Sequence, residues 1–254
     1  MPRAVAIEST AAKKPAAKRA VKEPVKPAAF EGFADTRCKF FHELSKNQDR
    51  EWFQAHKEIF ERGWNQPMAA LLAEVVKDID RAFPDCDLGQ PKLFRIYRDV
   101  RFGKDKSPYK THIGGHIMAR SRRAESVTEV PMALYFQAGT ETFAAAGQYM
   151  MSSEALTRFR AAVADPKRGP ELQKILSRLQ QKGFEPGAFE MMANVPRGYG
   201  PDHPRADLLR HKGLMVRFPK VPTALMTKPA LRKWLSEHIR LAAPLVRWLV
   251  FATS

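Results

Sequence analysis

Four consecutive segments in the middle of the chain constrain its fold more than any other feature. Their polar and apolar residues alternate, or they are rich in β-branched and aromatic residues, which is typical of β-strands. We expect strands over residues 93–100, 111–119, 132–138 and 142–149. Only residues 139–141 connect the last two, whereas a parallel crossover needs a dozen or more residues. The segments therefore predict an antiparallel meander.

Helical periodicity on both sides of these segments predicts helices that pack on the sheet. Before the strands, apolar residues three or four apart indicate three helices, the first following Asp35, the second capped by Asn47 or Asp49, and the third ending before Pro84. After the strands we expect helices over 154–164 and 171–182, a short helix at 208–209, a strand over 214–218, and a last helix that starts at Pro229 and is kinked at Pro244. The fold class is α+β: a central, mainly antiparallel sheet packed by N-terminal and C-terminal helices, in one domain over residues 30–254.

Residues 1–29 differ from the rest of the chain in composition. They consist largely of Ala, Lys and Pro, and they cannot bury enough apolar surface to offset their chain entropy, so we expect a disordered tail. The tail holds seven Lys or Arg and two Glu, a net charge of +5, which leaves +11 of the chain's +16 for the remainder. A chain this basic attracts polyanions such as nucleic acid.

Cysteine usage and hydropathy predict the compartment. The two cysteines, Cys38 and Cys86, show no spacing typical of a zinc site or a disulfide framework, which favours a reducing environment. No apolar run approaches the ~20 residues that cross a bilayer, and the N-terminus lacks the apolar core of a secretory signal. We therefore expect a soluble, cytoplasmic protein without a membrane partner.

The densest charge lies in residues 93–115, LFRIYRDVRFGKDKSPYKTHIGG. Strand alternation would direct Phe94, Ile96 and Val100 to the core and Arg95, Tyr97, Asp99 and Arg101 to the other face. Guanidinium and ammonium groups bind phosphate or carboxylate. The candidate anion-binding residues are Arg95, Arg98, Arg101, Lys104, Lys106 and Lys110.

The next two strands bring more polar residues to the same face, namely His112, Gly114, His116, Tyr135 and Gln137. The sequence thus predicts a polar pocket for an anion. The alternative is a pleated face that is latticed by arginine–aspartate pairs and covered by a helix, without a ligand.

The sequence gives only weak indications of catalytic residues or of a metal site. Tyr97, Asp99 and His112 are the candidates for proton transfer at the predicted pocket, and no nucleophile motif is present. His112 and His116 would stand about 13 Å apart on a strand, too far for one metal ion. The GKDKS loop lacks the glycine spacing of a nucleotide-binding loop. We therefore predict no metal and no cofactor.

Residues 95–115, RIYRDVRFGKDKSPYKTHIGG, resemble the hallmark of the bacterial and fungal family named domain of unknown function 2461. Residues 50–61 and 194–213 resemble it too, and the likeness covers roughly residues 30–242. Where that family tends toward a G-G-x-Y segment, this chain has AAAGQY at 144–149. The resemblance implies one α+β domain and no established activity, cofactor or substrate.

The resemblance also implies that residues 95–112 and 197–212 lie close together as two walls of one cleft. Candidates on the second wall are Arg197, Asp202, His203 and Lys212. His203 beside Asp202 suits acid–base work, or Asp202 caps the short helix that follows.

Three functions remain open on this sequence. The first is a binding module for nucleic acid or another polyanion, acting through the tail and the basic body. The second is an enzyme for a small molecule that bears phosphate or carboxylate, and the third is a structural or adaptor protein. The oligomeric state is left open.

Overall fold

The computed structural model describes residues 29–101, 104–122 and 130–253. The predicted disordered tail, residues 1–29, lies outside the described residues except for its last residue.

One antiparallel sheet forms the centre of the molecule. Its seven strands are ordered β1-β3-β4-β5-β7-β6, with β2 also paired to β3, and every pairing is antiparallel. This confirms the α+β class and the meander of β3, β4 and β5. The strand bounds are β1 Cys86–Leu88, β2 Lys92–Leu93, β3 His112–Ser121, β4 Met132–Gly139, β5 Phe143–Gln148, β6 Glu185–Gly187 and β7 Leu214–Arg217.

Helices lie both before and after the meander of β3, β4 and β5, as predicted. Their bounds are α1 Lys39–Lys46, α2 Arg50–Phe60, η1 Glu61–Asn65, α3 Gln66–Ile79, η2 Asp80–Ala82, α4 Ser153–Ala164, α5 Arg168–Gln181, α6 Ala206–Arg210, η3 Thr223–Leu225 and α7 Ala230–Thr253. The Asp49 side chain accepts a hydrogen bond from the Trp52 amide at 2.7 Å, so the predicted cap of α2 is present. The assigned helix α7 continues through Pro244.

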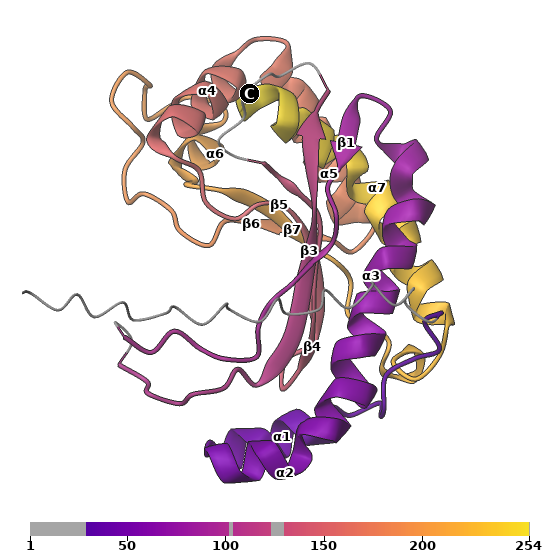
Figure 1. Cartoon of the computed structure of the whole chain (residues 1–254). Helices are drawn as coiled ribbons and strands as arrows, with labels where there is room; N and C mark the ends of the chain where they lie inside the picture. The colour runs from indigo at the N-terminus through magenta and orange to yellow at the C-terminus, as the bar shows by residue number, and fades with distance from the viewer. Residues whose placement is uncertain (1–28, 102–103, 123–129, 254) are drawn as a thin grey trace, which may run out of the picture.

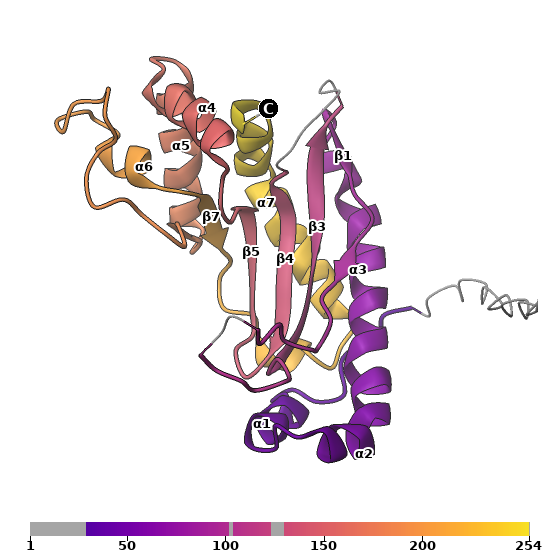
Figure 2. The same ribbon diagram turned by 60° about the vertical axis from the view of Figure 1, so that its left-hand side comes forward.

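Among the described residues, the helices cover one face of the sheet and leave the other open. Figure 1 shows α3 and α7 on the same side of β3 and β4, and Figure 2 looks onto the uncovered strands with α7 behind them. Alternate residues of β3 and β4, such as Ile113, Ile117 and Phe136, are buried between sheet and helices. Each strand therefore presents its other residues to the open face.

The predicted strand over residues 93–100 is wrong in extent. Regular pairing ends at Leu93, and beyond it the chain forms an irregular hairpin whose two arms are joined by hydrogen bonds from the Lys110 amide to the Ile96 carbonyl at 2.7 Å and from the Arg98 amide to the Pro108 carbonyl at 2.9 Å. A proline in the second arm provides no amide for a continuous ladder.

The irregular hairpin also changes which side chains face the core. Lys92 pairs with His116 on the open face, and Leu93 packs against the core, so Phe94 returns to the open face. Its ring lies 5.1 Å from that of His116. The prediction that Phe94 faces the core is therefore wrong, whereas Ile96 is buried as predicted.

Candidate ligand-binding cleft on the open sheet face

A row of side chains crosses six strands on the open face. Residues directly opposite one another in neighbouring antiparallel strands point to the same side of the sheet. Successive register pairs join Lys92, His116, Tyr135, Ala145, Arg217 and Glu185. The row has charged residues at both ends and the small side chain of Ala145 between Tyr135 and Arg217.

Small residues form a low floor beside this row. Ala145 lies on β5, and Gly147 has φ +121°, a conformation that a residue with a side chain rarely adopts. A Cβ at Gly147 would also approach the Leu214 carbonyl oxygen of β7 to 2.3 Å. The AAAGQY segment therefore keeps β5 close to β7 and leaves space above the sheet.

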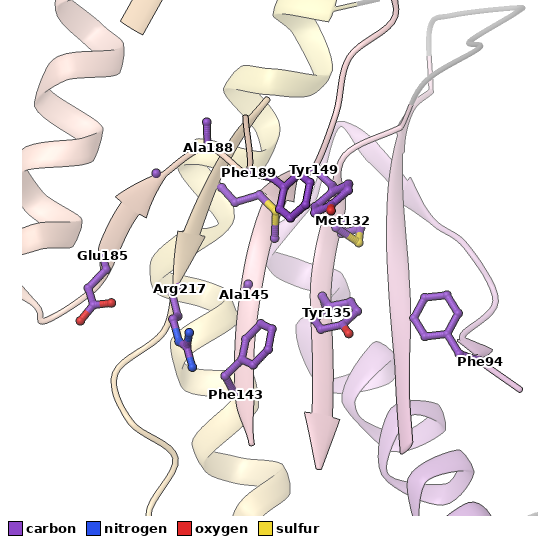
Figure 3. A pocket seen from close by; sticks show the side chains of 12 residues that line it. Phe94, Met132, Tyr135, Phe143, Ala145, Tyr149, Glu185, Ala188, Phe189 and Arg217 are labelled. Carbon is purple, nitrogen blue, oxygen red and sulfur yellow. The ribbon is translucent and has the colours of Figure 1, made fainter. Parts of the chain in front are cut away.

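Aromatic side chains surround that space, a cavity of about 590 Å³. Figure 3 shows Tyr135 and Phe143 on the neighbouring strands β4 and β5, Phe94 on the far side of β3, and Tyr149 and Phe189 at one end. The Tyr135 ring centroid lies 6.0 Å from that of Phe94 and 5.5 Å from that of Phe143. Tyr149 and Phe189 pack on each other at 4.6 Å, yet Phe189 is 71% exposed. The cleft thus presents flat apolar rings to solvent.

An ion pair orients Arg217, and a hydrogen bond orients Tyr135, at the edge of the cleft. Arg217 lies over the Phe143 ring at 4.4 Å and forms an ion pair with Glu141 at 2.6 Å. The Tyr135 hydroxyl donates to the Gln137 side-chain oxygen at 2.7 Å, and the Gln137 amide donates to the Glu141 carbonyl at 3.0 Å. Burial raises the pKa of Tyr135, so its phenol keeps its proton at neutral pH.

His112 and His116 share the open face with Tyr135 and Gln137, as the sequence predicted. Burial lowers the pKa of both imidazoles, and nearby Lys110 and Lys92 respectively lower it further. Glu141 opposes this effect at His112. Both histidines are therefore neutral at pH 7.

The predicted cationic segment is placed next to the cleft rather than in it. Arg98 pairs with Asp105, and Arg101 donates to Asp99 at 2.9 and 2.6 Å. Hydrogen bonds from Ser107 and then from Arg98 hold the pKa of Asp105 well below its usual range. These contacts are arginine–aspartate pairs, as in the alternative, but they lie on the irregular hairpin and not on a helix-covered sheet face.

The remaining predicted cations differ in how close they lie to the cavity. Lys106 donates to the Val100 carbonyl at 2.9 Å, and Arg95 and Lys104 are exposed. Lys110 donates to the Arg95 carbonyl at 2.9 Å and lies over the Phe94 ring at 5.4 Å, which puts it at the cavity edge. Tyr97 packs beside Phe53 and Tyr109 and does not line the cavity.

The predicted second wall lies at the other end of the open face. In Figures 1 and 2 the α6 segment and the hairpin after β2 project from opposite ends of the sheet. Lys212 pairs with Glu190, and Arg197 and Asp202 are exposed. Among the described residues, the side chains that line the cavity come from neither 95–112 nor 197–212.

His203 and Asp202 have structural surroundings. The His203 Nδ1 accepts from the Arg205 amide at 3.1 Å, just before α6, and no side-chain cap from Asp202 is present. The Arg205 side chain donates to the carbonyls of Val163 at 2.5 Å and Ala164 at 3.1 Å. This loop therefore fastens α6 to the end of α4.

Sequence reasoning missed most of the cavity lining. Phe143 and Tyr149 share the outward phase of the predicted strand 142–149, so alternation alone could have placed them beside Tyr135. Alternation along the predicted strand 214–218 could likewise have placed Arg217 on this face. Phe189 follows β6 in a loop, where no periodicity exists to place a side chain.

Two further features bear on chemistry. Within the described ranges, no cluster of three or more His, Cys, Asp or Glu side chains is arranged to hold a metal ion. The helices described here are too short or too polar to cross a membrane.

The family model described as conserved hypothetical protein (DUF2461) matches residues 36–248. The chain belongs to this family. The matched range contains all seven strands and therefore the whole open face of the DUF2461 fold. Neither the curated proteins nor the solved structures include a match to the chain.

Proposed function

We propose that this DUF2461 protein binds single-stranded nucleic acid on the open face of its sheet. The observation that carries the proposal is the group of five aromatic rings around a floor of alanine and glycine, in a chain of net charge +16. Unpaired bases stack on exposed aromatic side chains, while basic groups contact the phosphates.

The positions of the cations support this arrangement. Lys92 is exposed at one end of the cross-strand row, Lys110 lies over Phe94, and Arg217 lies over Phe143. Lys110 and Arg217 thus lie next to aromatic rings, and Lys92 lies in the same cross-strand row as Tyr135. A strand whose bases enter the cleft would have its phosphates within reach of these groups.

The shape of the site favours unpaired bases over a duplex. Rings such as Phe94 and Tyr135 stand on the sheet itself, and stacking on them requires a base with a free face. In a double helix both faces of each base are already stacked. We therefore expect a single strand to bind more tightly than a duplex of the same length.

The test is fluorescence anisotropy with a labelled single strand and the matching duplex, from low to physiological salt. Tyr149→Ala and Phe189→Ala should each weaken single-strand binding by roughly tenfold, because a stacked base contributes about 1–3 kcal/mol. Ile59→Ala is the matched control, since Ile59 is 53% exposed on α2 and does not line the cavity. Absence of binding at low salt, or equal affinity of all three variants and the wild type, would contradict the proposal.

An enzyme acting on a small anionic ring compound is the second candidate. It is favoured by the cavity of about 590 Å³, a size within the usual range for small ligands. Neutral His116, beside Phe94, is a proton acceptor at its edge. A thermal-shift screen with mononucleotides and aromatic carboxylates distinguishes the two: stabilisation by a monomer, without single-strand binding, selects the enzyme.

We place this activity in the cytoplasm. The basis is the pair of cysteines, Cys38 and Cys86, which are both free and buried. Burial raises the pKa of both thiols, so they are inert rather than reactive.

A further inference from the structure

A groove separates α5 from the last turns of α7, on a surface apart from the sheet. Its central part is a cavity of about 470 Å³. A second cavity of about 260 Å³ shares Ile175, Arg178 and Pro244 with it, and a third of about 330 Å³ shares Arg168 and Phe251. The three hollows therefore join into one groove along α5.

The floor of the groove is an apolar stripe of α7. Leu241, Pro244, Trp248 and Phe251 follow one another at three- and four-residue spacing, which puts them on one side of the helix. Leu241 is 45% exposed and Phe251 41% exposed, although both are large apolar residues. No described segment covers this stripe.

The wall of the groove is cationic. Arg168, Lys174, Arg178 and Lys182 of α5 and its C-terminal cap border it, against the carboxylates of Glu171 and, at the α4 end, Asp165. Arg168 lies over the Trp248 ring at 5.7 Å. The Nε of Arg247 is buried and has no hydrogen-bond partner among the described residues, although its guanidinium also pairs with Asp85. The groove thus combines uncovered apolar surface with excess positive charge.

We infer that this groove docks an acidic amphipathic helix of a partner protein. Such a helix lays apolar residues at three- and four-residue spacing into a hydrophobic groove, with its carboxylates toward the cationic wall. The α5 wall has 14 residues, which is about 21 Å at 1.5 Å per residue and matches a helix of about four turns.

Charge and shape exclude the other occupants. A second copy of the chain carries +16 and its N-terminal tail +5, so the cationic wall repels both. A flat bilayer surface cannot reach the floor of a groove at Trp248, which is 6% exposed. Of the two rings in the floor, Trp248 is 6% exposed and only Phe251 is open to solvent, so the groove offers bases far less stacking surface than the open sheet face.

The test uses the full chain and a fluorescein-labelled probe peptide of about four helical turns, with Leu at three- and four-residue spacing and Glu on both flanks. A peptide with Lys in place of every Glu is the control probe. Anisotropy at low salt should show binding of the acidic peptide only. The double variant Lys174→Glu/Arg178→Glu should lose the acidic peptide by at least tenfold and gain the basic one.

A second variant separates docking from general charge attraction. Phe251→Ala should weaken the acidic peptide several-fold at unchanged net charge, whereas Tyr149→Ala, on the open face, should leave it unchanged. Thermal melts verify that each variant folds. No binding of the acidic peptide, or equal binding by the charge-reversed variant, overturns the inference. If charge reversal instead removes single-strand binding or binding to phosphatidylserine vesicles while peptide binding persists, the groove has another ligand and the inference is also overturned.

Discussion

Buried histidines make single side chains sensitive to pH in this molecule. Burial is the largest cause of the lowered pKa of His112, His116 and His211. The Nδ1 of His211 is buried and has no hydrogen-bond partner among the described residues. A proton on any of these imidazoles is therefore favoured in the unfolded chain over the folded one.

This predicts that acid destabilises the fold below about pH 6.5, the ordinary histidine value. Because the unfolded state binds more protons, the free energy of unfolding is largest above that value and falls as the pH drops toward the lowered folded pKa values. A loss on the order of 1 kcal/mol corresponds to a fall of about 2–4 °C in Tm.

Melting curves at pH 7.5 and 5.5 measure this loss. The double variant His112→Gln/His116→Gln should reduce the difference between the two Tm values, whereas His42→Gln, on the exposed side of α1, should leave it unchanged. An equal Tm at both pH values in the wild type would contradict the prediction.

Arg205, within the segment predicted as the second wall, is a charged residue with a structural role. Its guanidinium donates to the Val163, Ala164 and Asp165 carbonyls at the C-terminal end of α4. Asp165 also accepts from the Gly169 amide, whereas among the described residues Arg205 is the donor to Val163 and Ala164. We expect Arg205→Met to lower the free energy of unfolding by about 1–3 kcal/mol, because it leaves these carbonyls unsatisfied. Arg197→Met, at an exposed position of the same loop, is the control. Urea titration measures both, and equal stabilities would show that the contact contributes nothing.

At the scale of elements, two adjacent glycines of β3 face opposite sides of the sheet. Gly115 faces the helices, and Gly114 faces the open side. A Cβ at Gly115 would lie 2.6 Å from Leu72 of α3 and 2.8 Å from the Lys92 carbonyl. A Cβ at Gly114 would meet the Phe136 carbonyl at 3.2 Å. Gly115 is therefore the position that allows α3 and β2 to approach the strand.

This contrast gives a matched pair of variants. Gly115→Ala should destabilise the fold by about 1–3 kcal/mol, because two packed elements must move to admit the methyl group. Gly114→Ala should have a smaller effect, since its contacts need to give by only a few tenths of an ångström. Urea midpoints rank the two, and a larger effect of Gly114→Ala would reverse the assignment of faces.

The alternation of polar and apolar residues predicted the regular strands, and it failed where the backbone no longer pairs regularly. β3, β4 and β5 fall within two residues of their predicted bounds, because each is long enough for one face to be buried. After Leu93 the hairpin is irregular. The predicted alternation therefore assigned Phe94 to the core, whereas its side chain lies on the open face. The cavity itself depends on β7 pairing with β5, although a long stretch of sequence separates them. No local pattern contains that information.

At the scale of the molecule, the two proposed surfaces divide the charge of the chain between different tasks. The open face combines aromatic rings with cations at its edge, whereas the α5–α7 groove combines an apolar stripe with a cationic wall. Residues 1–28 add seven Lys or Arg, and this segment contains no aromatic residue. Their contribution to nucleic-acid binding must be purely electrostatic.

This separation predicts two different signatures in salt titrations of single-strand binding. Deletion of residues 1–28 removes up to seven phosphate contacts, so the slope of log Kobs against log salt should become shallower by up to about 5. Phe189→Ala removes a stacking surface and no charge, so affinity should fall by roughly tenfold at every salt concentration with the slope unchanged. A chain that binds only through net charge would instead be insensitive to Phe189→Ala, and a small-molecule enzyme would keep its ligand after the deletion.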